Sequence, residues 1–194
     1  MAKIKWRGGA LLAPAPPALV TCGDMDNSNA LAVAWTGIIN TVPPKTYISV
    51  RPGRHSYGMI KESGEFVINL TSADMIKALD GCGMLTGAKV DKFKKFGLEK
   101  QEASAVKCPL VAQSPLALEC RVTDIIELGS HHMFLADVVA VDVEEDLIDQ
   151  NGKLRLDKAN LAAFAHGEYF ALGKKIGDFG FSVRKKKKTP PKKK

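Results

Sequence analysis

The chain has 194 residues, of which 45% are hydrophobic and 25% are charged. This balance is that of an ordinary soluble globular protein, and it excludes a disordered chain, a collagen-like repeat and a multi-span membrane protein. A chain of this length is expected to form one domain whose hydrophobic core needs no disulfide or metal to stabilise it.

The net charge of +7 is concentrated at the C-terminal end. Eight of the 28 basic residues lie from Arg184 onward and no acidic residue follows them, so residues 1–183 carry 20 basic and 21 acidic side chains. The sequence therefore predicts a nearly neutral domain over 1–183 and a disordered basic tail over 184–194, which has no apolar content with which to fold. The tail is either a solubilising extension or a segment that binds anionic lipid, RNA or an acidic electron-transfer partner.

The cysteines and the N-terminal segment both indicate a cytoplasmic protein. The four cysteines include no CxxC pair and no zinc spacing with a histidine, which is typical of reduced packing residues. Pro14, Pro16 and Pro17 interrupt the apolar stretch of residues 10–20, so this stretch is a poor export signal. No apolar run approaches the roughly 20 residues of a transmembrane helix.

The first third of the chain is predicted to be a β-meander with one helical interruption. Segments rich in β-branched and aromatic residues alternate with turn signals such as the pair Pro43-Pro44. The predicted strands are Ala18–Cys22, Ala30–Trp35, Thr46–Val50 and Phe66–Leu70. The interruption, Ser56–Ser63, is predicted to be a short helix with Ser56 as its N-cap.

Helical spacing of apolar residues predicts a second helix over Ser72–Leu79. Asp80–Lys107 has many glycines and lysines and no strong period, so we expect a surface excursion there. Leu116–Ile126 and His131–Val143 are predicted to form an antiparallel hairpin of long, curved strands. A further helix is predicted over Asp157–Ala165.

Together these elements predict a mainly β fold with short helices, built as an antiparallel barrel. The chain lacks the strand–helix alternation of a doubly wound nucleotide-binding domain. Gly81-Cys82-Gly83 also fails as a dinucleotide fingerprint, because Thr86 stands where its third glycine belongs. No phosphate loop, zinc helix or nucleophile elbow occurs, and neither a catalytic residue nor a metal site can be named.

A cationic segment precedes the first predicted helix. Arg51 and Arg54 approach Ser56 at the predicted helix start. Two guanidinium groups, a hydroxyl and the free N–H groups at the positive end of a helix could hold a phosphate. Charge-assisted bonds of roughly 1.5–3 kcal/mol each would outweigh the helix dipole, which contributes about 0.3–1 kcal/mol. The same residues are also compatible with a solvated loop before a helix.

Several short motifs follow one another along residues 8–181. They are Ala34-Trp35-Thr36-Gly37-Ile38, Pro43-Pro44, Ser49-Val50-Arg51, Ser56-Tyr57-Gly58, Asn69, Asp91-Lys92-Phe93, Leu118-Glu119-Cys120-Arg121-Val122, Gly129-Ser130-His131 and Asp137-Val138. Each motif is weak alone. Their order and spacing resemble those of the flavin reductase-like family, the FMN-binding split barrels, and especially its flavoredoxin branch.

The resemblance implies an antiparallel Greek-key split β-barrel that forms a homodimer and binds FMN without a covalent bond near the subunit interface. The residues it assigns to the cofactor are Ala34, Trp35 and Thr36 beside the isoalloxazine ring, Ser49, Val50 and Arg51 along the ring and ribityl chain, Arg54, His55, Ser56 and Tyr57 around the phosphate, and Lys92 against the flavin. Members of the family vary at positions 54 and 55.

Some of these residues have other interpretations. Lys92 is alternatively a solvated member of a lysine cluster, and Trp35 a core or dimer-interface aromatic. His131 and His132 lie on opposite faces of a predicted strand, which is poor geometry for one metal ion. His166 either approaches the flavin or a nicotinamide, or caps a helix.

Three functions are compatible with these observations. The first is an FMN-binding oxidoreductase of the flavin reductase type, which moves electrons from NAD(P)H through FMN to a flavin, a metal complex or a protein acceptor. The second is a flavoredoxin-type electron carrier that a protein partner reduces. The third is a non-enzymatic barrel that its lysine tail tethers to nucleic acid or membrane. No residue distinguishes NADH from NADPH, because the chain has no dinucleotide fingerprint.

Overall fold

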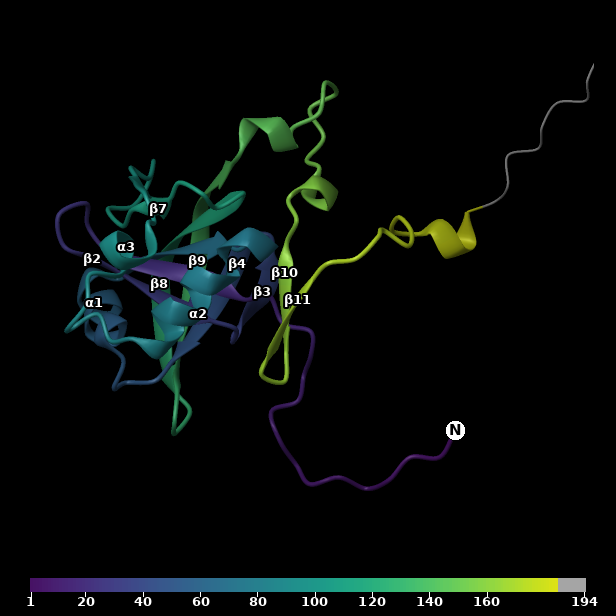
Figure 1. Ribbon diagram of the computed structural model, residues 1–194, viewed down its shortest axis with the longest axis horizontal. Coiled ribbons are helices and arrows are strands. Elements are labelled where there is room, and N and C mark those ends of the chain that lie inside the picture. Colours follow the sequence, from purple (N-terminus) through teal and green to yellow (C-terminus); the bar gives the residue numbers. More distant parts are fainter. Residues whose placement is uncertain (185–194) are drawn as a thin grey trace, which may run out of the picture.

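The computed structural model of the protein describes residues 1–184, and its centre is one seven-stranded antiparallel sheet (Figure 1). The strands lie in the order β2-β1-β5-β8-β9-β4-β3. They are β1 (Ala18–Gly23), β2 (Ser28–Val33), β3 (Thr36–Thr41), β4 (Pro44–Val50), β5 (Glu65–Leu70), β8 (Leu116–Glu127) and β9 (His132–Val143). Within the described residues the outer strands β2 and β3 do not pair with each other, so the barrel is split. The predicted fold class is confirmed.

The predicted long hairpin forms the middle of the barrel. Strands β8 and β9 pair from Leu116 opposite Val143 to Glu127 opposite His132. The register shifts twice along this pair, and such bulges bend and twist a strand, which lets two twelve-residue strands follow a curved surface. Because β9 also pairs with β4, the hairpin connects the two halves of the sheet.

Short helices and two small hairpins complete the described chain. The helices are α1 (His55–Ser63), α2 (Ile76–Met84) and α3 (Lys92–Phe96), with 3-10 turns at Ala73–Met75, Glu145–Leu147, Leu156–Lys158 and Phe181–Val183. The hairpins pair β6 (Lys100–Gln101) with β7 (Leu110–Val111) and β10 (Ala162–Ala165) with β11 (Glu168–Ala171). The helices pack on both faces of β1 and β2: Ile60 of α1 lies in the cluster with Val20, whereas Leu79 of α2 and Phe93 of α3 lie in the cluster with Leu19 on the other face.

Strand β1 is buried along almost its whole length because it carries apolar side chains on both faces. Val20 points into the barrel, where it packs with Phe66 and Phe134. Leu19 points the other way, into a second cluster with Leu79 of α2. Successive side chains of a strand alternate between faces, so one segment supports both cores. All four cysteines are reduced and buried.

Several predicted elements are wrong. The predicted helix over Asp157–Ala165 is instead a 3-10 turn followed by strand β10. Positive φ angles at His166 (50°) and Gly167 (90°) form the tight turn that returns the chain into β11. Strand β3 was not predicted. The segment 80–107 is only partly a surface excursion, because Phe93 and Leu98 are buried. The predicted basic tail lies outside the described residues from 185 onward.

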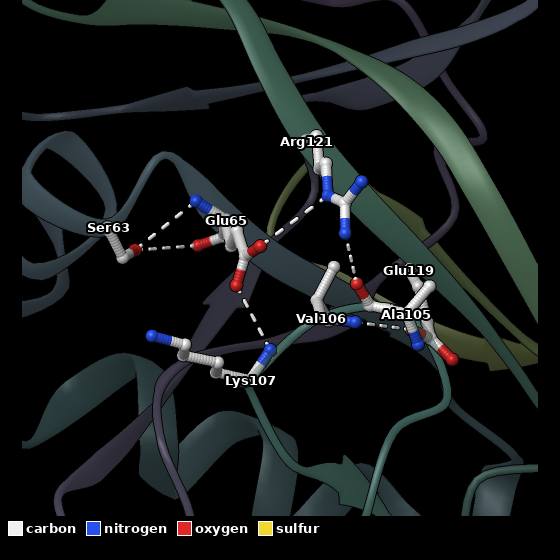
Figure 2. A network of polar contacts seen from close by, with 7 residues as sticks. All are labelled: Ser63, Glu65, Ala105, Val106, Lys107, Glu119 and Arg121. Atoms are coloured by element: carbon white, nitrogen blue, oxygen red, sulfur yellow. Dashed lines mark hydrogen bonds and ion pairs between the residues drawn. The ribbon is translucent and has the colours of Figure 1, made fainter.

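A buried carboxylate of β8 fixes the loop that precedes β7 (Figure 2). Glu119 is fully buried and accepts hydrogen bonds from the backbone N–H groups of Ser104 (2.7 Å), Ala105 (2.6 Å) and Val106 (2.9 Å). Burial alone would raise its pKa, but the bonds from Ser104 and Ala105 outweigh that cost, so the pKa of Glu119 is lowered. The carboxylate therefore stays charged and binds the loop to the sheet.

The Asp142 carboxyl group on the neighbouring strand has the opposite behaviour. Burial, together with the adjacent Glu119, raises the pKa of Asp142 to about 6. The folded protein therefore holds this proton more tightly than the unfolded chain does. Its stability falls as the pH rises from about 4 through about 6. Asp142→Asn should make unfolding at pH 7.5 less favourable by about 1–2 kcal/mol, and the gain should vanish below pH 4.

Urea denaturation at both pH values measures this effect. Asp146→Asn, at an exposed residue of the next turn, is the control that removes the same charge. An equal gain from Asp146→Asn, or a gain from Asp142→Asn that persists at pH 4, would contradict the assignment.

Candidate functional site

A cleft of about 220 Å³ opens where β2, the end of β4 and the β10–β11 hairpin come together. It is lined by Leu31, Ala32, Val33, Ala34, Trp35, Ser49, Val50, Arg51, Arg54, His131 and Phe164. Six of the eleven residues predicted to bind the cofactor line it, namely Ala34, Trp35, Ser49, Val50, Arg51 and Arg54. The structure therefore brings together in one cleft residues that the sequence places in two separate segments.

Strand pairing and a tight turn position the cleft. The N–H group of Ser49 donates to the carbonyl of Trp35 at 2.9 Å, which holds the end of β4 beside the turn after β2. Val50 pairs with His132 across β4 and β9. The N–H group of Arg54 donates to the carbonyl of Arg51 at 3.0 Å, and this turn sets both guanidinium groups at the cleft.

The first turn of α1 is open to an anion. Arg54 is the N-cap of this nine-residue helix, and no side chain caps the first turn. The prediction of Ser56 as the N-cap is therefore wrong. Helix starts carry free N–H groups and partial positive charge, which an anion can satisfy. Among the described residues 1–184, one of the five N–H donors of Arg54 has a protein partner, because Nη1 donates to the Gly83 carbonyl at 2.9 Å.

The Ser56 hydroxyl points into the protein rather than into the cleft. Ser56 is fully buried, and its Oγ accepts a hydrogen bond from Nδ2 of buried Asn29 at 2.7 Å. Its side chain therefore attaches α1 to β2. A contribution of Ser56 to a bound phosphate stays a prediction, and it would come from the backbone N–H group.

Lys92 lies outside the lining of the cleft. Its ammonium group donates to the carbonyls of Ala30 and Cys82, both at 2.7 Å, and the residue is 3% exposed. Burial lowers the pKa of Lys92, and the nearby charge of Arg54 lowers it further. The alternative interpretation of Lys92 as a solvated lysine is therefore wrong. These two hydrogen bonds use two of the three N–H donors of the ammonium group. The predicted contact of Lys92 with a flavin stays a prediction.

The other predicted residues lie around the cleft without lining it. The Thr36 hydroxyl donates to the carbonyl of Tyr47 at 2.6 Å. His55 is exposed at the start of α1. Tyr57 faces the barrel, where its hydroxyl lies 2.8 Å from Nδ1 of His132 and its ring packs edge-on against Phe134. Contacts of Thr36, His55 and Tyr57 with a cofactor stay predictions.

Five lining residues were not assigned to the site from the sequence: Leu31, Ala32 and Val33 of β2, together with Phe164 and His131. Phe164 comes from β10, which was predicted as a helix, and its ring packs edge-on against Trp35 with centroids 6.5 Å apart. His131 comes from the β8–β9 turn, and burial together with Arg51 and Arg54 lowers its pKa. The motif Gly129-Ser130-His131 was recognised in the sequence, but the position of His131 at the cleft depends on pairing between strands that are distant in the chain.

The cleft has the chemistry to bind a phosphate beside a flat ring. Two guanidinium groups and an uncapped helix start supply donors to an anion, while Val33, Val50 and Trp35 supply apolar walls. Pockets that enclose a whole ligand measure roughly 300–1,000 Å³, so a nucleotide here would be only partly covered by this chain.

Among residues 1–184, no group of three histidine, cysteine, aspartate or glutamate side chains is placed to hold a metal ion. The same residues contain no helix with the length and apolar character needed to cross a membrane.

Comparisons with known proteins agree with this architecture. The flavoredoxin of Desulfovibrio vulgaris (Miyazaki F) superposes with a TM-score of 0.86 at 30% identity, covering 94% of this chain and 99% of that chain. An uncharacterised protein of Archaeoglobus fulgidus is 29% identical over 117 residues, 60% of this chain and 66% of that protein. The FMN reductase (NADH) RutF of Bradyrhizobium diazoefficiens is 24% identical over 99 residues, so this chain spans 53% of its length.

A sequence profile described as "Flavin reductase like domain" matches residues 11–172, which include every strand of the sheet and the whole cleft. The chain therefore belongs to the flavin reductase-like family, on its flavoredoxin branch.

Proposed function

We propose that this chain is an FMN-binding oxidoreductase of the flavin reductase type. It would move electrons from NAD(P)H through bound FMN to a flavin, a metal complex or a protein acceptor. The observation that supports this most is the cleft itself, which gathers Arg51, Arg54 and the uncapped start of α1 together with Trp35. Membership of the flavin reductase-like family and the similarity to an NADH-dependent FMN reductase add support.

FMN, when bound, supplies the hydride and electron transfer, and the protein supplies binding, orientation and electrostatics. In this proposal Arg51 and Arg54 bind the phosphate together with the free N–H groups of the first turn of α1. Trp35 and Val50 flank the ring, and backbone N–H groups near Trp35 donate to its polar edge. A donor or cation at that edge favours reduction, because reduced flavin carries negative charge there.

The remaining predicted residues complete this arrangement. Ser49 lines the ribityl chain beside Val50, and His55, Ser56 and Tyr57 act through the first turn of α1 on which they stand. Ala34 and Thr36 hold the turn on either side of Trp35. Lys92 contributes a positive charge from its position against Ala30 of β2.

We also propose that the chain works as a homodimer. Ile38 of β3 is 63% exposed and Val141 of β9 is 51% exposed, so these strands present apolar side chains to solvent. A second copy would cover this surface and the part of the nucleotide that one chain leaves open.

Titration of the purified protein with FMN tests the proposal, and we expect saturation at one FMN per chain. The loaded protein is then mixed with NADH and with NADPH in the absence of oxygen. Bleaching of the oxidised flavin absorbance with at least one of them is the expected result. A chain that binds no FMN would refute the proposal.

A flavoredoxin-type electron carrier is the second candidate, and the match to a flavoredoxin over 94% of this chain favours it. In that case a protein partner reduces the bound FMN and nicotinamide plays no part. The same mixing experiment decides between the two, because FMN that binds but stays oxidised with both NADH and NADPH would leave only the carrier.

A further inference from the structure

A second hollow, of about 360 Å³, adjoins the cleft. Trp35 and Phe164 line both spaces, so together they form a common wall. The N-terminal segment of residues 10–13 lines the second hollow on another side, and His166 and Gly167 line it from the turn between β10 and β11. We call this hollow the aromatic pocket.

The lining of the aromatic pocket is mainly apolar and includes the rings of Trp35 and Phe164. The ring centroids of Phe164 and Tyr169 lie 5.4 Å apart, so the wall that Phe164 shares with Trp35 is backed by a third ring. Trp35 is 38% exposed and Leu11 is 48% exposed, so apolar surface is available to a ligand. Two aromatic rings that pack against each other gain more free energy than the buried area alone provides.

The lining also lacks fixed charge. Within residues 1–184, this lining contains no lysine, arginine, aspartate or glutamate, and His166 is its only ionisable side chain. An ionic group that enters such a pocket loses hydration without gaining a counter-charge. The guanidinium groups of Arg51 and Arg54 line the cleft on the other side of the common wall, and the proposed function already assigns them to the phosphate of FMN.

We propose that the aromatic pocket binds an uncharged, planar, conjugated molecule that is the electron acceptor of the bound flavin. NAD(P)H would supply the electrons that reduce the cofactor, and the reduced cofactor would pass two electrons and two protons to this molecule, which is reduced as the cofactor is reoxidised. This inference rests on the proposed function for its redox role. The pocket would place such a molecule next to the cofactor, because Trp35 belongs to both spaces. It would disfavour a pyridine dinucleotide, since its lining offers no cation to a pyrophosphate.

A matched pair of probes tests the charge preference. 2-Naphthamide and 2-naphthoate share one ring system, and only the second carries a charge at neutral pH. Calorimetric titration of the FMN-loaded full chain should show that the amide binds about tenfold or more tightly than the carboxylate, and NADH should not displace the amide. Equal affinities, tighter binding of the carboxylate, or displacement by NADH would overturn the proposal.

A lysine in the lining should change this preference. Ala10 is exposed and lines the aromatic pocket but not the cleft. Ala10→Lys should bring the affinity for 2-naphthoate up by about tenfold, because the buried carboxylate gains a counter-charge. Ala2→Lys, exposed on the same segment outside the lining, is the matched control. If both variants change binding equally, the proposed location is wrong.

FMN binding is measured separately, from flavin fluorescence, so the two proposals fail in different ways. If FMN binds and the two naphthalene probes are not distinguished, the pocket assignment fails while the proposed function stands. If FMN does not bind but Ala10→Lys still alters probe selectivity, the pocket assignment stands and the proposed function fails.

Discussion

Replacing both Arg51 and Arg54 by alanine should raise the dissociation constant for FMN by at least about 100-fold. Each guanidinium group would lose charge-assisted bonds to the phosphate, worth roughly 1.5–3 kcal/mol per bond. Both side chains are exposed at the cleft, so solvent screening favours the lower end of that range. Quenching of flavin fluorescence during titration measures the constant.

Lys61→Ala is the matched control for this double variant. Lys61 lies in the last turn of α1, so its removal takes one positive charge from the same helix at the end remote from the cleft. Its FMN affinity should stay close to that of the parent protein. Thermal unfolding of the double variant checks that loss of the Arg54–Gly83 bond leaves the fold intact. An unchanged dissociation constant in a folded double variant would show that the phosphate is bound elsewhere.

Replacing Lys92 by methionine should destabilise the fold by about 2–4 kcal/mol. The ammonium group donates to the carbonyls of Ala30 and Cys82, and methionine can satisfy neither. Hydrogen bonds to a charged group are worth roughly 1.5–3 kcal/mol, and relief from burying a charge offsets part of their loss. Urea denaturation, with the midpoint and slope fitted together, measures the change.

Lys94→Met, at an exposed position of the same short helix, should change stability by less than about 0.5 kcal/mol. If the two variants behave alike, the two bonds of Lys92 are not stabilising. FMN affinity of folded Lys92→Met gives a separate answer about the flavin. A weakened affinity would support the predicted contact between Lys92 and the cofactor, and an unchanged affinity would assign Lys92 to the fold alone.

Much of the barrel could be predicted because local residue patterns identify most of its strands. The β8–β9 hairpin combines two long apolar-rich segments with a Gly129 turn, and β1 is a largely apolar segment. The helix predicted over residues 157–165 was wrong because alanines favour a helix, whereas pairing with β11 makes residues 162–165 a strand. The turn at His166 could not be predicted from the sequence, because positive φ is uncommon for residues other than glycine.

The site was predictable where its residues are close in sequence. Arg51 and Arg54 stand beside a helix start, and that local pattern led to the cleft. His131 and Phe164 reach it only through long-range strand pairing and hairpin packing, which no local pattern records. Ser56 illustrates the opposite error, because a hydroxyl near a helix start suggests a cap until burial shows it bonded to Asn29.

The wall formed by Trp35 and Phe164 is common to two hollows, so a ligand that changes the position of these rings in one hollow would also change the lining of the other. Any ligand that rotates or immobilises these rings alters the free energy with which a second ligand is taken up next door. Such linkage is reciprocal, so whatever factor the first occupant imposes on the second is returned in full. Occupancy on one side of this wall would then change how firmly a ligand is retained on the other side.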